Sequence, residues 1–474
     1  MTAEGLAAGE RERAASARIP RPARQAPADL TITFVDEASV RAHGVEAGEP
    51  DWLLADRLEG LAAYEALPME TNRLYTSYVD LRTAHLSNVR PASRAAAAAT
   101  PTIVGKVPVG AAGLAETGND GPISLVLSRE ARAAGVILET LADLGRRYPG
   151  ELRRLLEGGC TLPKDDKLAQ LTRAAWTDGI HIHVPDGARL EQPIVIRWSV
   201  GRPGAALLSR TIIDVGADAE VSILEEQLCA DGVSVDDPEQ GLFAGTTEVE
   251  LGPGSSLSFA GLQDLPLREI AFQHRSAVVA KGSTLRWALA HLGSRVVRSR
   301  IDNRLEGDGS SVEQAEIVFG SSDQLFDLTS YTRHLGRDTT GNLLSKGALA
   351  DSSRAYMKGL ATIDETAHGT DSFLGEFGML LSRQARSVAI PSLEIDQPDC
   401  RRVAHASSVG PIDEGQVFYL QSRGLERDEA RKSIVMGYLE PVVARVPLAS
   451  ARDRLRDLLE AKWDARQAGV PAGA

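Results

Sequence analysis

Histidine and cysteine are the residues of this sequence whose types and spacing could support metal chemistry. Cys400 stands five residues before His405, and the other two cysteines are Cys160 and Cys229. Thiolate and imidazole groups both bind metal ions such as iron, so the segment 400–405 is a candidate metal-handling segment. The alternative is that His405 is a hydrogen-bonded histidine of a turn. Three scattered cysteines make neither a disulfide framework nor a CxxC metal site. We interpret Cys160 and Cys229 as buried, unreactive thiols.

A second pair of imidazoles is formed by His181 and His183. They stand two residues apart in the alternating run Ile180–Val184, so both project from the same face of the predicted strand. This pair favours an alternative function, a metal-dependent enzyme of the cupin-like β-helix kind. No third ligand follows at short spacing, although catalytic metal sites usually have three protein ligands. A carbohydrate-active β-solenoid is a further alternative and would require clustered acidic residues facing a groove.

Several function classes are disfavoured by the sequence. The net charge of −13 makes nucleic acid an unlikely principal ligand. No run approaches the about 20 apolar residues that a membrane span requires, and the first residues lack the apolar core of a secretory signal. We therefore expect a cytoplasmic protein with a disordered segment 1–28. Neither a GxxxxGK[ST] phosphate loop nor a GxSxG nucleophile motif occurs, so we expect no ATP hydrolysis by this chain.

The candidate residues follow or lie within a long region of predicted strands. Residues 29–173 are expected to be mostly helical, with a linker near 92–121. Residues 174–404 are dense in Val, Ile and Thr in short alternating runs, which indicates strands. A glycine followed by small residues recurs between these runs, at Gly187, Gly216, Gly254, Gly282, Gly309 and Gly347. Repeats of about 20–50 residues are typical of stacked coils. The alternative is an ordinary β-sandwich whose turns contain glycine.

The last segment, 405–474, is predicted to be a helical domain. Asp413 is placed to cap a helix that Gly424 ends. Two amphipathic stretches follow, and they are expected either to cap the β region or to bind a partner.

The C-terminal part of the chain also resembles a known family. The segments Pro391–Asp396, Val403–Gly410 and Asp413–Gly424 match the pattern "P-x-L-E-I", a His followed by small residues, and "D-E-x-Q-x-F-Y-L-x-S-R-G". This pattern is similar to that of the SufB/SufD family of the SUF iron–sulfur cluster assembly machinery. Ala406 after the motif His is closer to SufD, since SufB-like chains have Glu there. Val403 stands where many SufD-like chains have Cys.

The resemblance carries specific expectations. It implies a right-handed parallel β-helix with helical domains at both ends, acting as a non-ATPase scaffold subunit. The implied partners are a SufC-type ABC ATPase and either a SufB-type subunit or a second copy of this chain, without nucleic acid or membrane. No cofactor is expected to be bound stably by the chain alone, and a transient iron–sulfur cluster is expected at the subunit interface. Cluster assembly at this interface is assigned to His405 and Cys400, and ATPase docking to Phe418, Tyr419, Ile434 and Tyr438.

Overall fold

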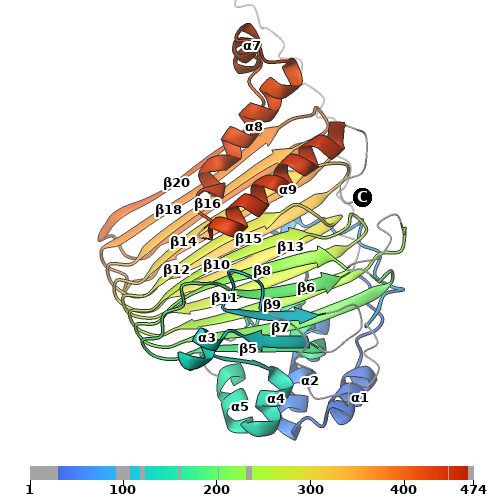
Figure 1. The fold of residues 1–474 in the computed structure, drawn as a ribbon, viewed down its shortest axis with the longest axis vertical. Helices are drawn as coiled ribbons and strands as arrows, with labels where there is room; N and C mark the ends of the chain where they lie inside the picture. The colour runs from blue at the N-terminus through green and yellow to red at the C-terminus, as the bar shows by residue number, and fades with distance from the viewer. Residues whose placement is uncertain are drawn as a thin grey trace, which may run out of the picture.

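Two stacked parallel β-sheets form the centre of the molecule, and helices stand at both ends (Figure 1). The computed structural model describes residues 30–91, 107–117, 123–157, 162–200, 202–230, 237–446 and 448–467. Successive strands from β5 to β20 alternate between the sheets, and each pairs in parallel with the strand two places along the chain. Each coil therefore contributes one strand to each sheet, and the fold is a β-solenoid of about eight coils, as predicted.

Sheet A contains, in spatial order, β19 (Arg386–Ile395), β17 (Arg354–Ile363), β15 (Leu325–His334), β13 (Val296–Leu305), β11 (Ile270–Val279), β9 (Leu242–Leu251), β7 (Ala205–Val215), β5 (Asp178–Val184) and β4 (Ile137–Thr140), with β1 (Arg90–Pro91) beside β7. Sheet B contains β20 (Cys400–Pro411), β18 (Thr370–Leu380), β16 (Thr340–Leu349), β14 (Ser311–Gly320), β12 (Thr284–His291), β10 (Ser256–Asp264), β8 (Glu220–Cys229), β6 (Ile194–Val200), β2 (Gly113–Thr117) and β3 (Ile123–Leu127).

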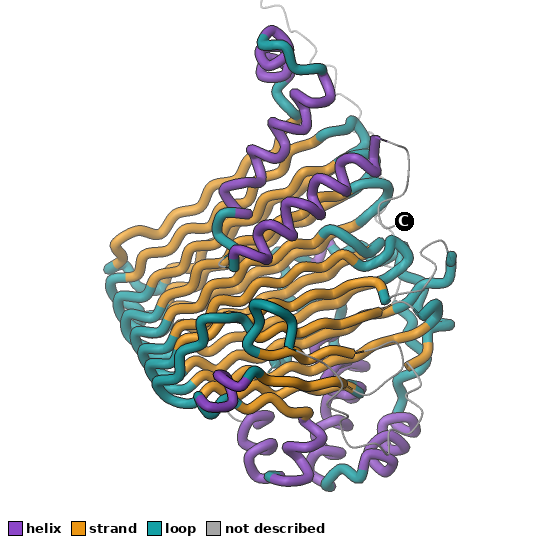
Figure 2. Tube along the Cα trace, viewed as in Figure 1, coloured by secondary structure: helices purple, strands orange, loops and turns teal. Residues whose placement is uncertain are grey.

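The helices lie before and after the solenoid strands, as the coloured tube shows (Figure 2). Those of the N-terminal region are α1 (Glu37–Ala47), α2 (Asp51–Ala66), the 3-10 helix Thr76–Tyr78, α3 (Arg129–Ala133), α4 (Leu141–Arg147), α5 (Pro149–Glu157) and α6 (Lys167–Ala175). Those of the C-terminal region are α7 (Glu414–Ser422), α8 (Arg427–Val443) and α9 (Ala449–Gln467).

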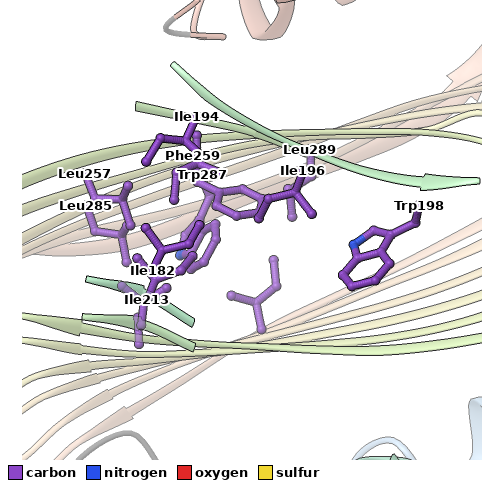
Figure 3. Packing of buried hydrophobic residues seen from close by; sticks show 14 of the residues in the cluster. Ile182, Ile194, Ile196, Trp198, Ile213, Leu257, Phe259, Leu285, Trp287 and Leu289 are labelled. Atoms are coloured by element: carbon purple, nitrogen blue, oxygen red, sulfur yellow. The ribbon is translucent and has the colours of Figure 1, made fainter. Parts of the chain in front are cut away.

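The space between the sheets is filled by stacked side chains from equivalent positions of successive coils (Figure 3). Leu257 pairs in register with Leu285, and Phe259 with Trp287, whose rings meet edge to face with centroids 5.0 Å apart. All four side chains are buried. Burying a side chain of this size stabilises the folded state by roughly 1.5–3 kcal/mol. The inward-facing row of each strand therefore sets the register in which neighbouring strands pair.

One corner of the solenoid repeats a left-handed backbone conformation. Gly254 (φ 71°) and Gly282 (φ 67°) occupy it between strands, and Asp218 (φ 55°) and Asp338 (φ 55°) occupy the equivalent place in other coils. The N–H group of Gly254 donates to the carbonyl of Lys281 in the next coil, at 2.9 Å. Glycine and aspartate tolerate positive φ better than most residues, which explains why they recur at this corner.

The predicted repeat is correct at four glycines and wrong at two. Gly187 and Gly309 also have positive φ, whereas Gly216 does not, because Asp218 takes that role in its turn. Gly347 lies inside β16, and the left-handed residue of the following turn is Asp351 (φ 52°). The turn after Gly347 belongs to the other corner of the coil, where Ser294 (φ 62°) and Ser322 (φ 51°) take the same conformation. The glycine spacing alone therefore misplaces both turns.

Buried ion pairs attach the N-terminal region to the outer face of sheet A. Lys358 of β17 lies 2.5 Å from Asp327 of β15 and 3.7 Å from Glu70, which precedes the 3-10 helix. Arg298 of β13 lies 3.4 Å from Asp166, the residue that caps α6. All five side chains are buried. Removing one partner of such a pair leaves an uncompensated buried charge, so these contacts fix where the N-terminal region sits.

Helices α8 and α9 cover the outer face of sheet B. Val435, Leu439, Leu455 and Trp463 are buried there against outward-facing residues of β10 to β16. The predicted caps are present: the Asp413 carboxylate accepts from the N–H of Gly415 at 2.8 Å, and Gly424 past the end of α7 has φ 99°. The apolar stripes of these helices are therefore used for packing within the chain.

Several element boundaries differ from those the sequence suggested. Within the region 29–173, which the sequence predicts to be mostly helical, residues 129–157 are divided into α3, β4, α4 and α5, and β2 lies within the segment 92–121. The last strand continues to Pro411, so His405 lies in the middle of β20 and the helices begin at 414 instead of 405. Residues 1–28 and Cys160 lie outside the described residues. The small residues after His405 hid this strand, since they lack the bulky alternation that predicts one.

Candidate functional site

The C-terminal end of the solenoid exposes two strand edges. Among the described strands, β19 pairs only with β17, and β20 pairs only with β18. No residue of either strand is fully buried, in contrast to the strands before them. An unpaired strand edge presents free N–H and C=O groups to another chain, so this end is a surface suited to pairing.

His405 lies at the centre of this end. It pairs in register with Leu374 of β18, which is buried, and parallel partners project to the same side of a sheet. The imidazole therefore stands on the inward-facing row of the last strand of sheet B. His405 is exposed, and its imidazole has no hydrogen bond or ion pair within the described part of the chain. Its ring nitrogens can accept a proton or bind a metal ion.

Cys400 stands at the beginning of the same strand. Its thiol donates to the carbonyl of Gln397 at 3.1 Å. Burial, reinforced by the carboxylate of Asp399, raises the pKa of this thiol, so it is predominantly protonated at neutral pH. Five residues of extended chain separate the Cα atoms of Cys400 and His405 by on the order of 15 Å. The structure therefore does not bring these two candidate residues together within one chain.

A buried carboxyl group lies beneath the last coil and was missed by the sequence analysis. Glu376 of β18 projects inward, and its Oε2 accepts from the N–H of Ile390 in β19 at 2.8 Å. Burial raises the pKa of Glu376 to about 8, and the charge of Glu316 adds to this effect. The carboxyl is largely protonated at neutral pH, and it links sheet B to the terminal strand of sheet A. No local pattern distinguishes it from a solvent-facing Glu.

The four candidate docking residues divide into two pairs. Phe418 and Tyr419 of α7 are 71% and 55% exposed, and α7 stands clear of the sheets at the C-terminal end of the solenoid (Figure 1). Ile434 and Tyr438 of α8 are partly buried against sheet B. Lys346 of β16 donates to the carbonyl of Tyr438 at 2.8 Å, and its ammonium lies 4.6 Å from the centre of the Tyr438 ring. Only the α7 pair is free to contact another protein through most of its side-chain surface.

The two histidines of the alternative function each face a different carboxylate. His181 lies 3.2 Å from Glu139, and His183 lies 3.0 Å from Asp214. The hydrogen bond to Asp214 raises the pKa of His183, which favours imidazolium over a neutral metal ligand. No group of three His, Cys, Asp or Glu side chains suited to a metal ion occurs among the described residues. Each histidine is therefore held by one carboxylate at the base of the N-terminal helices, and the two do not share a ligand set.

Two further observations concern residues named from the sequence. Cys229, at the end of β8, is partly buried and has its thiol 3.6 Å from the carbonyl of Ala230. Within the described ranges, no helix combines the length and apolar character that crossing a membrane requires.

Comparison with known proteins gives a consistent assignment. Residues 197–438, just over half of the chain, match the family described as SUF system FeS cluster assembly, SufBD core domain. The iron–sulfur cluster assembly protein SufD of Bacillus subtilis is 25% identical over 91% of this chain and 99% of its own length. The SufB protein of the same organism is 25% identical over 61% of each chain. A SufBD family protein of Mycobacterium tuberculosis is 26% identical over 70% of this chain and 83% of its own. The chain belongs to the SufBD family of iron–sulfur cluster assembly proteins.

Proposed function

We propose that this chain is a SufD-like scaffold subunit that pairs through its terminal coil with a SufB-type subunit and docks a SufC-type ATPase through α7. The observation that carries the proposal is the C-terminal end of the solenoid, where two strand edges and His405 are exposed together. The similarity to SufD over nearly the full length of both chains supports the SufD-like assignment, whereas the match to SufB is partial.

The terminal strands supply the pairing surface. The edges of β19 and β20 are 10 and 12 residues long, and a partner strand can continue each sheet by main-chain hydrogen bonds. A partner bound at this end would bring its own ligands close to His405. That arrangement accounts for a site that is incomplete in one chain: Cys400 lies too far along the strand to share an iron with His405. The iron–sulfur cluster is then cargo assembled between two subunits.

Helix α7 supplies the contact with the ATPase. Its two aromatic side chains present more than half of their surface to solvent, with the Arg423 guanidinium 5.2 Å from the centre of the Tyr419 ring. Aromatic residues contribute strongly at protein interfaces. This chain lacks a phosphate-binding loop, so ATP hydrolysis is assigned to the partner. We place the complex in the cytoplasm.

A double substitution tests the docking assignment. In co-purification with a co-expressed SufC-type ATPase, Phe418→Ala with Tyr419→Ala is expected to abolish capture of the ATPase. The matched control is Tyr148→Ala, since Tyr148 is 60% exposed and lies in the N-terminal region. Undiminished capture by the double variant would refute the role of α7. Deleting all three helices is a poorer test, because it would also expose the face of sheet B that α8 and α9 bury.

A separate experiment tests the pairing. The size of the purified complex, measured by light scattering, is expected to show one copy of this chain with one SufB-type subunit. Two copies of this chain without a SufB-type subunit would replace that assignment by self-pairing.

A further inference from the structure

A cavity of about 290 Å³ lies on the outer face of sheet B, beside the C-terminal end of α8. It is separate from the inward-facing row that carries His405 and from the aromatic pair of α7. Its walls come from five strands, β12, β14, β16, β18 and β20, and from Arg445, which lies two residues past the end of α8. The side chains that decide its chemistry are Arg286, Glu313, Leu344, Phe373, Arg402 and Arg445.

The charge in this cavity is predominantly positive. Three guanidinium groups line it against one carboxylate, Glu313. Arg402 is held by Asp371 at 2.6 Å, whereas the closest approach of Arg286 to Glu313 is 4.0 Å. Within the described part of the chain, Arg445 has no carboxylate within ion-pair distance. Arg286 also donates to the hydroxyl of Ser256 at 3.3 Å. A guanidinium group has five N–H donors, so Arg286 and Arg445 both keep donors for an incoming anion.

The pKa of the neighbouring Lys346 is also affected by the positive charge of this cavity. Burial lowers the pKa of its ammonium, and the charge of Arg445 lowers it further. The ammonium is already engaged by the carbonyl and the ring of Tyr438. It therefore adds positive potential beside the cavity without closing it.

The floor of the cavity is apolar. Leu344 of β16 and Phe373 of β18 project outward from adjacent strands, and the Arg402 guanidinium lies 5.9 Å from the centre of the Phe373 ring. The volume lies at the lower end of the range for small-molecule sites, so it suits a ligand of about one ring with an anionic group.

We propose that this cavity binds a small organic phosphate, with its phosphate group between Arg286 and Arg445 and its apolar part on Leu344 and Phe373. Guanidinium groups bind phosphate by paired hydrogen bonds, and a dianion gains more than a carboxylate from several cations. The carboxylate of Glu313 repels the phosphate group and so limits the affinity for the ligand.

Calorimetric titration of the full-length chain with phenyl phosphate, inorganic phosphate and benzoate tests this site. Phenyl phosphate is expected to bind at one site per chain and more tightly than either of the others. Arg445→Gln is expected to weaken it about tenfold, and Glu313→Gln to strengthen it about threefold, the sizes expected for single charged contacts. The control Arg189→Gln removes a charge that is also exposed but lies outside the cavity, and it should change nothing.

Three results would overturn the proposal. Absence of saturable phenyl phosphate binding would exclude the site, and equal losses in the Arg445 and Arg189 variants would reduce it to general charge attraction. If inorganic phosphate bound as tightly as phenyl phosphate, the apolar floor would not contribute to binding. If benzoate bound as tightly, the guanidinium groups would not select a phosphate group. Unchanged melting curves of the variants establish that each is folded.

Discussion

At its N-terminal end the solenoid is covered by its own chain: β4 pairs antiparallel with β5, and β3 pairs antiparallel with β2, which flanks β6. Leu141 of α4 packs so closely on β5 that a Cβ at Gly179 would lie 2.6 Å from it. At the C-terminal end, β19 and β20 have no strand beyond them among the described residues, and none of their residues is fully buried. The chain thus covers one end of the stack with short antiparallel strands and helices, and leaves the longer strand edges of the other end available to a second protein.

The largest expected difference between the two ends concerns their ion pairs. Arg210 and Glu248, between the N-terminal helices and sheet A, are both buried and 2.6 Å apart. Arg210→Ala is expected to lower the free energy of unfolding by about 3–5 kcal/mol, because it leaves the Glu248 charge buried and unpaired. Arg401, which pairs with Asp338 near the open end, is exposed, and Arg401→Ala should cost less than about 1 kcal/mol.

Urea denaturation of both variants measures this difference. Similar losses in the two variants would mean that burial does not distinguish the ends as the structure indicates.

The second prediction concerns pH and the buried carboxyl at the open end. The pKa of Glu376 is about 8 in the folded chain and about 4.5 when unfolded, so between these values the folded state holds a proton that the unfolded state has lost. Stability from this group is present below pH 4.5 and is lost as the pH rises towards 8. The linked loss is roughly 3 kcal/mol between pH 5 and 8.

The substitution Glu376→Gln should remove this loss. The variant should have a higher free energy of unfolding than the unchanged chain at pH 8, and nearly the same value at pH 5. Thermal unfolding at the two pH values checks the sign. A variant that is destabilised equally at both would show that Glu376 is ionised in the folded chain.

The third and smallest stability effect concerns the corner that runs along the whole solenoid. No atom lies within 4 Å of a Cβ built at Gly282, so its positive φ is the only obstacle to a side chain there. Gly282→Val is expected to cost about 1–3 kcal/mol, since branched residues avoid this conformation. Gly282→Asn should cost much less, because Asp218 and Asp338 already occupy equivalent positions. Equal melting temperatures for the Val variant and the unchanged chain would contradict the corner assignment.

The sequence predicts the solenoid well because its evidence is repeated in every coil. Alternating Val, Ile and Leu residues and the recurring corner glycines signal the same structure many times, so errors at Gly216 and Gly347 did not change the fold. The end of the solenoid has no such redundancy. His405, Ala406 and the serines after it look like a loop, and only pairing with β18 shows that they form a strand.

The candidate site is predicted less well, for a physical reason. Helical periodicity shows that α7 and α8 each have an apolar face, but it does not show what that face contacts. Ile434 and Tyr438 pack on sheet B, whereas Phe418 and Tyr419 do not. Likewise, the sequence indicates Cys400 and His405 as candidate residues five positions apart, and the extended strand β20 holds them far from each other. The pKa of Glu376 depends on burial between sheets, which no local pattern reveals.

The measurement that tests the central claim most directly is the iron and acid-labile sulfide content of the co-purified complex, prepared without oxygen. His405→Ala is expected to lower both while the subunits and the ATPase still co-purify, because alanine neither binds iron nor transfers a proton. Cys400→Ser should have a weaker effect, because that thiol is hydrogen-bonded to the carbonyl of Gln397 and lies far from His405 along the strand. Undiminished iron and sulfide in the His405 variant would contradict the assignment of the open end as the assembly surface, and a larger loss from Cys400→Ser would place the chemistry at the beginning of β20.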